Sequence, residues 1–259
     1  MRSFSKLLLL IALAMPACAA DLSAEQVKAR IVEAAGRPVD LSKLDLSGLD
    51  LSGVDFKTAK LVGTKLFGTK LVRANLAGAD LSEANLDAAW LTSANFTGAK
   101  LTNASIFAPV IFTTLDARAS ETPNFSSADL SGARLVARLN SADLTNAKLT
   151  GVRSGVDMRN QPMGQMRHDL SSANLSGADL AGADLNRALL QFANLSRARL
   201  RDANLFRADL SGANLSGADL SNADLREAKL TNADFAGAVL NGTKLEGSID
   251  PPTQGSFAR

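Results

Sequence analysis

Large apolar residues recur at every fifth position along most of the chain, and small or polar residues lie between them. The spacing is unbroken from Leu41 to Ile111 and from Leu170 to Leu245, and six further centres lie from Phe125 to Leu149. Of these 37 centres 31 are Leu, and Ala stands two residues before 27 of them. Such regularity indicates an architecture built from one small repeated unit.

Neither an α-helix nor a straight strand can bury all of these centres on one side. Five residues rotate by about 500° on a helix, so successive centres scatter around the cylinder. On a strand, an odd step sends consecutive centres to opposite faces. The chain must therefore turn a corner in every repeat, so that each centre, and the Ala two residues before it, points toward a shared axis. Coils of this kind stack about 4.8 Å apart, which predicts a solenoid held together by neighbouring coils.

The repeated motif is A-(D/N)-L-x-x, as in residues 79–83 (ADLSE), 84–88 (ANLDA), 213–217 (ANLSG) and 218–222 (ADLSN). It resembles the pentapeptide repeat family, and the resemblance covers about residues 39–247. It implies an all-β fold, a right-handed parallel β-helix with four sides. Asp or Asn before each centre suits a corner because its side chain hydrogen-bonds to nearby backbone. We therefore interpret these side chains as structural rather than catalytic.

Residues 1–20 are typical of an export signal. Arg2 and Lys6 supply the positive charge, Leu7–Met15 is an apolar stretch of nine residues, and Pro16–Ala20 supplies a small-residue cleavage site. Nine apolar residues are too few to cross a bilayer core, which needs about 20. We expect the mature protein to be periplasmic or secreted.

Cys18 leaves a second interpretation of this segment open. With Met15–Ala17 before it, Cys18 resembles the lipidated cysteine of a bacterial lipoprotein box, although Met15 and Pro16 depart from the usual pattern. Lipidation would anchor the protein to a membrane. Ordinary cleavage after Ala19 or Ala20 would remove the thiol, and we favour that reading.

The two ends of the repeat region differ from its middle. Residues 21–38 predict a short capping helix, with Ser23 and Gln26 forming a capping box and Val27 on its apolar stripe. Such a helix would cover the first coil, because the end coils of a solenoid expose strand edges. Residues 248–259, with two consecutive prolines, predict a tail that ends the stack.

Two stretches interrupt the repeat, near residues 113–124 and near residues 150–169. We interpret the second as a loop bulging from one edge, either a recognition element or a tolerated insertion. A single residue is also missing between Leu135 and Leu139. His168 occupies an inward Ala position beside Asp169, where it is expected to fill the space in which the coils resume.

Composition excludes several classes of function. The chain has one Cys, one His and no Tyr, which excludes a disulfide framework or a Cys-cluster metal site. Once Arg2 and Lys6 leave with the signal, 26 basic residues face 26 acidic ones. This balance does not favour nucleic acid as a partner. No cofactor or metal is expected, and no catalytic constellation accompanies His168, so we do not expect an enzyme.

If outward residues are aligned at every fourth repeat, a local basic band with two aromatics emerges on the C-terminal half. We expect Asp202 to be its main opposing charge. The band either binds an anionic or carboxylate-bearing protein partner or is a set of solvated surface charges without a partner. The candidate partner-binding surface comprises Arg187, Phe192, Arg197, Arg199, Arg201, Phe206, Arg207 and Arg226.

Two functions follow from this reading. The first is a non-catalytic, rigid scaffold for protein–protein interaction in the cell envelope, acting on an unknown protein partner. The second comes from the family resemblance, since some pentapeptide repeat proteins mimic DNA and inhibit topoisomerases. The export signal and the balanced charge disfavour it. The family also implies a possible homodimer, formed end to end.

Overall fold

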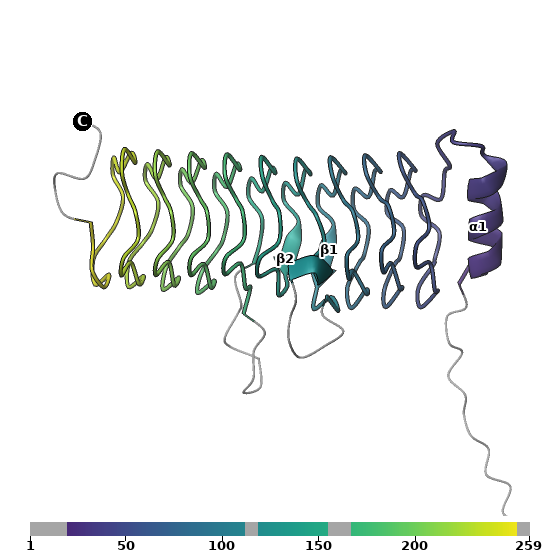
Figure 1. The fold of residues 1–259 in the computed structure, drawn as a ribbon, viewed down its shortest axis with the longest axis horizontal. Helices are drawn as coiled ribbons and strands as arrows, with labels where there is room; N and C mark the ends of the chain where they lie inside the picture. The colour runs from purple at the N-terminus through teal and green to yellow at the C-terminus, as the bar shows by residue number, and fades with distance from the viewer. Residues whose placement is uncertain (1–19, 112–118, 155–166, 253–259) are drawn as a thin grey trace, which may run out of the picture.

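The computed structural model describes residues 20–111, 119–154 and 167–252, and these residues form an elongated stack of coils (Figure 1). Helix α1 (Ala24–Glu33) lies across one end of the stack, and the C-terminal coil lies at the other end (Figure 1). The structure therefore confirms the repeat solenoid. Within the described residues, no helix has the length and apolarity needed to cross a membrane.

Parallel backbone bridges join the residue before each centre to its counterpart one coil later. In the first coils the partners are 20 residues apart, as in Asp40↔Lys60 and Asp45↔Lys65. One turn of the chain carries four such bridges, so the bridges form four columns along the stack. The first, second, third and fourth columns begin at Asp40, Asp45, Asp50 and Asp55.

The corner of each repeat is a tight turn that starts at the centre. In the repeat of Leu41, Leu44 N–H donates to Leu41 C=O, and Lys43 has a left-handed backbone with φ of 63°. These are the features of a type II turn. Asp40 lies just before the corner, and its carboxylate accepts the Ser42 N–H at 3.0 Å. Asp or Asn thus plays the expected local role, one residue ahead of the turn.

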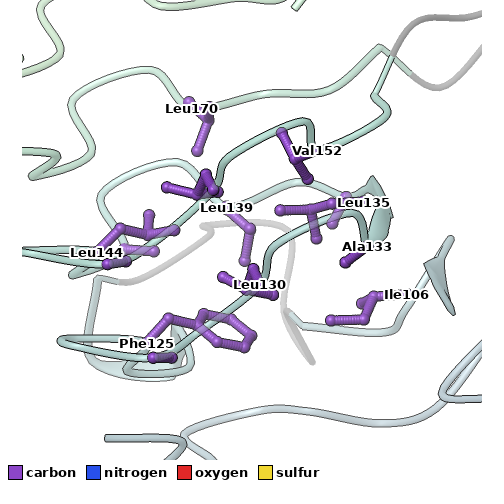
Figure 2. Close-up of a cluster of buried hydrophobic side chains, with 14 of the residues drawn as sticks. Ile106, Phe125, Leu130, Ala133, Leu135, Leu139, Leu144, Val152 and Leu170 are labelled. Atoms are coloured by element: carbon purple, nitrogen blue, oxygen red, sulfur yellow. The ribbon is translucent and has the colours of Figure 1, made fainter. Parts of the chain in front are cut away.

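The centres fill the interior of the stack. Figure 2 shows Leu130, Leu135, Leu144 and their neighbours converging from successive coils on one apolar core. The Ala residues two positions earlier are buried with them, as the side-chain parity predicts. Where the centre is Phe, the ring is buried in the interior as a leucine side chain would be. The rings of Phe96 and Phe125 stack, with their centroids 4.8 Å apart.

The only strands longer than one residue in the described part are β1 (Ser105–Phe107) and β2 (Arg134–Val136), which pair in parallel. They flank the first interruption, and Asn95 pairs with Asn124, 29 residues later. A 3₁₀ turn, η1 (Ala119–Glu121), leads back into the repeat. The missing residue after Leu135 gives a coil of 19 residues, as in Asn124↔Asp143.

The second interruption is shorter than residues 150–169. The repeat continues through Ser154, which is buried at a centre position and donates its hydroxyl hydrogen to Asp184 C=O. Arg153 pairs with Asp184, 31 residues later, so the extra residues lie between Ser154 and the next coil. The sequence pattern missed this repeat because a small hydroxyl replaces the apolar centre.

Helix α1 closes the first coil. Ser23 and Gln26 form the predicted capping box, and Val27 is fully buried against the core. Just before the helix, Asp21 hydrogen-bonds to the backbone of Asp45, which lies at the open edge of the first coil. Its backbone N–H donates to Asp45 C=O at 2.7 Å, and its carboxylate accepts the Asp45 N–H at 2.6 Å. One residue thereby satisfies both edge groups of Asp45.

Candidate functional site

The structure distributes the candidate surface around the solenoid. Phe206, Arg207, Arg226 and Arg187 belong to the second column's corners, since Arg187 N–H donates to Phe206 C=O and Arg207 N–H donates to Arg226 C=O. Arg199 is a bridge residue of the first column, and Arg201 lies two residues after it. Phe192 and Arg197 follow the third and fourth columns. The eight residues do not form one continuous face.

The cluster that does form is centred on Phe206. The Arg207 guanidinium lies 4.8 Å from the ring centroid, and the Arg226 guanidinium lies 5.9 Å from it. Contacts of this kind are attractive because the ring face is electron-rich. Phe206 is only half-buried, so an aromatic ring in contact with two cations is partly exposed to solvent. We call Arg187, Phe206, Arg207 and Arg226 the second-column cluster.

Most of these arginines have acidic partners that the sequence analysis did not assign. Arg207 pairs with Glu227 at 2.6 Å, and Arg226 pairs with Asp224 at 2.6 Å. Hydrogen bonding to Asp224 raises the pKa of Arg226, and hydrogen bonding to Asp219 raises that of Arg201. Arg199 pairs with Asp179 at 2.7 Å. The expectation that Asp202 is the main opposing charge was wrong, because Arg199 and Arg201 pair with Asp179 and Asp219 of the neighbouring coils.

Arg187 and Arg197 are the exceptions. Neither forms an ion pair with any described residue. Arg187 is half-buried within the second-column cluster, whereas Arg197 is exposed on the fourth column. The free positive charge of the candidate surface is thus carried by two residues on different sides.

Phe192 stands apart from the second-column cluster. Its side chain is 70% exposed, and a Cβ built on Gly212 would come within 2.5 Å of its ring. Phe192 therefore lies flat over the backbone of the next coil, in a space that only glycine leaves open.

His168 is buried, as predicted. Its Nδ1 lies 3.2 Å from Ala137 O and 3.3 Å from Ala137 N, and its Nε2 has no partner. Burial lowers the pKa of His168 to about 4, against opposing contributions from Ala137 and the Asp169 charge. The ring is neutral near pH 7 and does not reach solvent. The described residues also contain no group of three metal-ligating side chains, and Cys18 lies outside them.

The bridges reveal two outward patterns. Charges alternate in sign along the first column until its last residue, and the fourth column carries only Asn and Asp. The first column reads Asp40, Lys60, Asp80, Lys100, Asp129, Lys148, Asp179, Arg199, Asp219 and Val239. The fourth reads Asp55, Asn75, Asn95, Asn124, Asp143, Asn174, Asn194, Asn214 and Asp234. Reading either column from sequence requires the lengths of the irregular coils.

Comparison with known proteins agrees with this geometry. The family model for pentapeptide repeats matches eight copies, over residues 39–71, 69–106, 124–153, 169–205 and 208–247. The chain belongs to the pentapeptide repeat family. A comparison of this pentapeptide repeat protein with curated proteins found no significant match.

Solved structures of other pentapeptide repeat proteins resemble it. HetL, involved in heterocyst differentiation regulation in the cyanobacterium Nostoc, is 33% identical with a TM-score of 0.63, and the match covers 88% of this chain and 94% of HetL. QnrB1, a plasmid-mediated fluoroquinolone resistance protein, is 21% identical with a TM-score of 0.38, over 78% of this chain and 89% of QnrB1. A thylakoid-lumen protein of Arabidopsis thaliana is 28% identical with a TM-score of 0.29, over 45% and 72%.

Proposed function

We propose that this pentapeptide repeat protein is an exported, non-catalytic scaffold that binds a protein partner in the cell envelope. The second-column cluster is the contact surface. The four bridge columns support the finer description of the scaffold as a right-handed quadrilateral β-helix. The signal-like segment at residues 1–20 supports export to the periplasm or beyond it, with lipidation of Cys18 as the membrane-anchored alternative.

The observation that carries this proposal is the pair of cation–π contacts that Arg207 and Arg226 make with the ring of Phe206. Aromatic and Arg side chains dominate binding energy at protein interfaces. Here the acidic partners Glu227 and Asp224 fix both guanidiniums, so little side-chain freedom is lost on binding. Arg187, which has no acidic partner among the described residues, supplies the charge that favours a carboxylate-bearing partner.

The rigidity of the support also favours a scaffold. Each repeat around the cluster is tied to the next coil by backbone hydrogen bonds, for example Leu205 N–H to Asp224 C=O at 2.8 Å. A site carried by such a framework keeps its geometry without a ligand. The absence of an evident acid–base pair around buried His168 gives no support to catalysis by the described residues.

The test is crosslinking in envelope extracts with matched variants. Phe206→Ala is expected to remove a specific crosslinked partner, whereas Phe192→Ala, which removes an exposed ring on the third column, should retain it. Arg226→Ala should weaken capture. Equal capture by both Phe variants would reject the second-column cluster as the contact surface.

The alternative function, inhibition of a topoisomerase by DNA mimicry, requires an extended array of negative charge. The first column alternates in sign, and the fourth is mostly neutral Asn. A DNA supercoiling assay with gyrase distinguishes the two functions. Inhibition at stoichiometric concentration would favour the alternative.

A further inference from the structure

The fourth column carries a shallow polar pocket that the second-column cluster does not include. Its volume is about 530 Å³, and its lining includes three serines, three asparagines and one arginine from successive coils. Six of the lining residues carry the argument: Ser176, Ser196, Ser216, Asn194, Asn214 and Arg197. We call them the fourth-column pocket.

The serine hydroxyls of this pocket make no hydrogen bond to any described residue. By contrast, Ser221 Oγ on the first column donates to Asp219 at 2.6 Å. In the pocket, Asn174, Asn194 and Asn214 accept the backbone N–H of the serine two residues later, and not its hydroxyl. Three serine hydroxyls are therefore left free, one per coil and about 4.8 Å apart.

Arg197 is the single cation of the lining. It is exposed and pairs with no acid in the described part of the chain, unlike Arg199 and Arg201 on the first column. Its aliphatic stem lies over Gly217, where an added Cβ would stand 3.6 Å from Arg197 Cγ. The stem is thus supported by the next coil while the guanidinium stays free.

Of the acidic residues nearest the pocket on the fourth column, one is hydrogen-bonded to Thr145 and the other lies one coil beyond the lining. Asp143 accepts both the N–H and the hydroxyl of Thr145, at 2.9 and 2.6 Å. Asp234 follows Asn214 one coil later and is not part of the lining. A carboxylate bound at Arg197 therefore meets amides and hydroxyls rather than a second carboxylate.

We propose that the fourth-column pocket binds a linear acidic polysaccharide, with Arg197 pairing with a carboxylate and the serines and asparagines hydrogen-bonding to hydroxyls. The lining has no aromatic or large aliphatic side chain, which are the usual anchors of a protein interface. A row of neutral donors and acceptors repeated at each coil matches a ligand that repeats hydroxyls along an extended chain. The guanidinium adds a bidentate site for carboxylate.

The turn geometry supplies a matched pair of variants. Arg197 and Arg73 occupy the same turn position on different columns, with φ of 57° and 55°, and Arg73 is likewise exposed and forms no ion pair with a described residue. Glycine accepts this backbone freely, so Arg197→Gly and Arg73→Gly each remove one unpaired charge without straining the fold. Only the first variant alters the pocket.

The test is calorimetric titration of the whole chain with polygalacturonate oligomers, neutral dextran and polyglutamate. We expect Arg197→Gly to weaken binding of polygalacturonate about 10-fold or more, because a hydrogen-bonded charge is lost. Arg73→Gly, outside both proposed surfaces, should retain affinity within about two-fold. Dextran should bind more weakly than polygalacturonate, and polyglutamate should not compete.

Three results would overturn the proposal. One is no binding of polygalacturonate by the unmodified chain. Another is an equal loss in both glycine variants, which would show a diffuse charge effect. The third is competition by polyglutamate as strong as that by polygalacturonate, which would assign the site to an acidic protein segment. None of these results bears on crosslinking through Phe206, so the two proposals fail separately.

Discussion

Nearly every described repeat has a residue with a left-handed backbone two positions after its centre; the repeat of Leu135 in β2 does not. Glycine supplies it at many corners, but Lys43, Arg197 and Phe192 supply it at others. A non-glycine residue there costs on the order of 1 kcal/mol. The type II turn and its backbone hydrogen bonds offset that cost, and the outward position gains a functional side chain. The arginines of both proposed surfaces include residues of this class.

The centres provide the main stabilisation at this scale. Leu205 is fully buried in the middle of the longest unbroken run. Leu205→Ala should lower the free energy of unfolding by about 2–5 kcal/mol, because the rigid coils cannot collapse around the cavity. Denaturant unfolding measures this change. A loss below about 1 kcal/mol would contradict burial of the centre.

His168 should make stability depend on pH. Its pKa is about 4 in the folded state against 6.5 in the unfolded chain, so between these values the unfolded chain takes up the proton more readily. Stability should therefore fall as the pH drops through this window. From pH 7 to pH 5 we expect a loss of about 2 kcal/mol from this residue.

The control for that prediction is His168→Leu, which fills the site without titrating. Denaturant unfolding at pH 7 and pH 5 should show a smaller loss in the variant than in the original chain. Most carboxylates titrate below this range, so they contribute little to the difference. Equal losses in both proteins would mean that His168 is protonated in the folded state.

At the scale of a column, alternating charge specifies how coils align. A coil displaced by one level along the first column would place like charges over one another. The alternation continues from Lys100 to Asp129 and from Lys148 to Asp179, across both irregular coils. Because like charges opposite one another destabilise a sheet, the column favours the native stacking at the places where coil length varies.

Lys100 offers a test, since it bridges to Asp80 and Asp129 and its Nζ lies 4.0 Å from the Asp80 carboxylate. Lys100→Asp would place three acids in a row. It should destabilise the fold by about 0.5–1 kcal/mol more than Lys100→Gln does. Thermal unfolding in low and high salt measures this. If the difference between the variants does not shrink with salt, its origin is not charge repulsion.

The columns also show where sequence reasoning stops. The five-residue period predicted the buried centres and the Asp and Asn hydrogen bonds, and the spacing of Ser23 and Gln26 predicted the capping box. It did not predict the ion pairs of the basic band, because Arg201 with Asp219 and Arg207 with Glu227 depend on which coils are adjacent. Ser154 was missed as a centre because its hydroxyl hides the period. Hydrogen bonds within one repeat could be predicted from the sequence, whereas ion pairs between coils could be predicted only once the length of each coil was known.

At the scale of the whole molecule, the two ends differ. Helix α1 covers the first coil, whose Val39, Leu44 and Leu49 pack against the core only in part. In the last described coil, Leu240 and Leu245 are partly buried and Ile249 is 50% exposed. The solenoid is therefore closed by a helix at one end, and its other end keeps apolar surface accessible.

Removal of residues 21–38 should uncover both the apolar first coil and its strand edge. We expect the shortened chain to self-associate, because open edges and exposed apolar residues favour pairing between molecules. Light scattering against the chain that retains α1 measures this. A shortened chain that remains monomeric at the same concentration would show that the helix is dispensable for closure.

The clamp that Asp21 places on Asp45 links the proposed export to the final fold. Under that proposal, cleavage after Ala20 makes Asp21 the new first residue, and the nitrogen that donates to Asp45 C=O becomes the terminal amine. A peptidase acting one residue later would discard the clamp altogether. The fold therefore sets a limit on the cleavage position. Cleavage must occur before Asp21 if the mature protein is to keep the hydrogen bonds to Asp45.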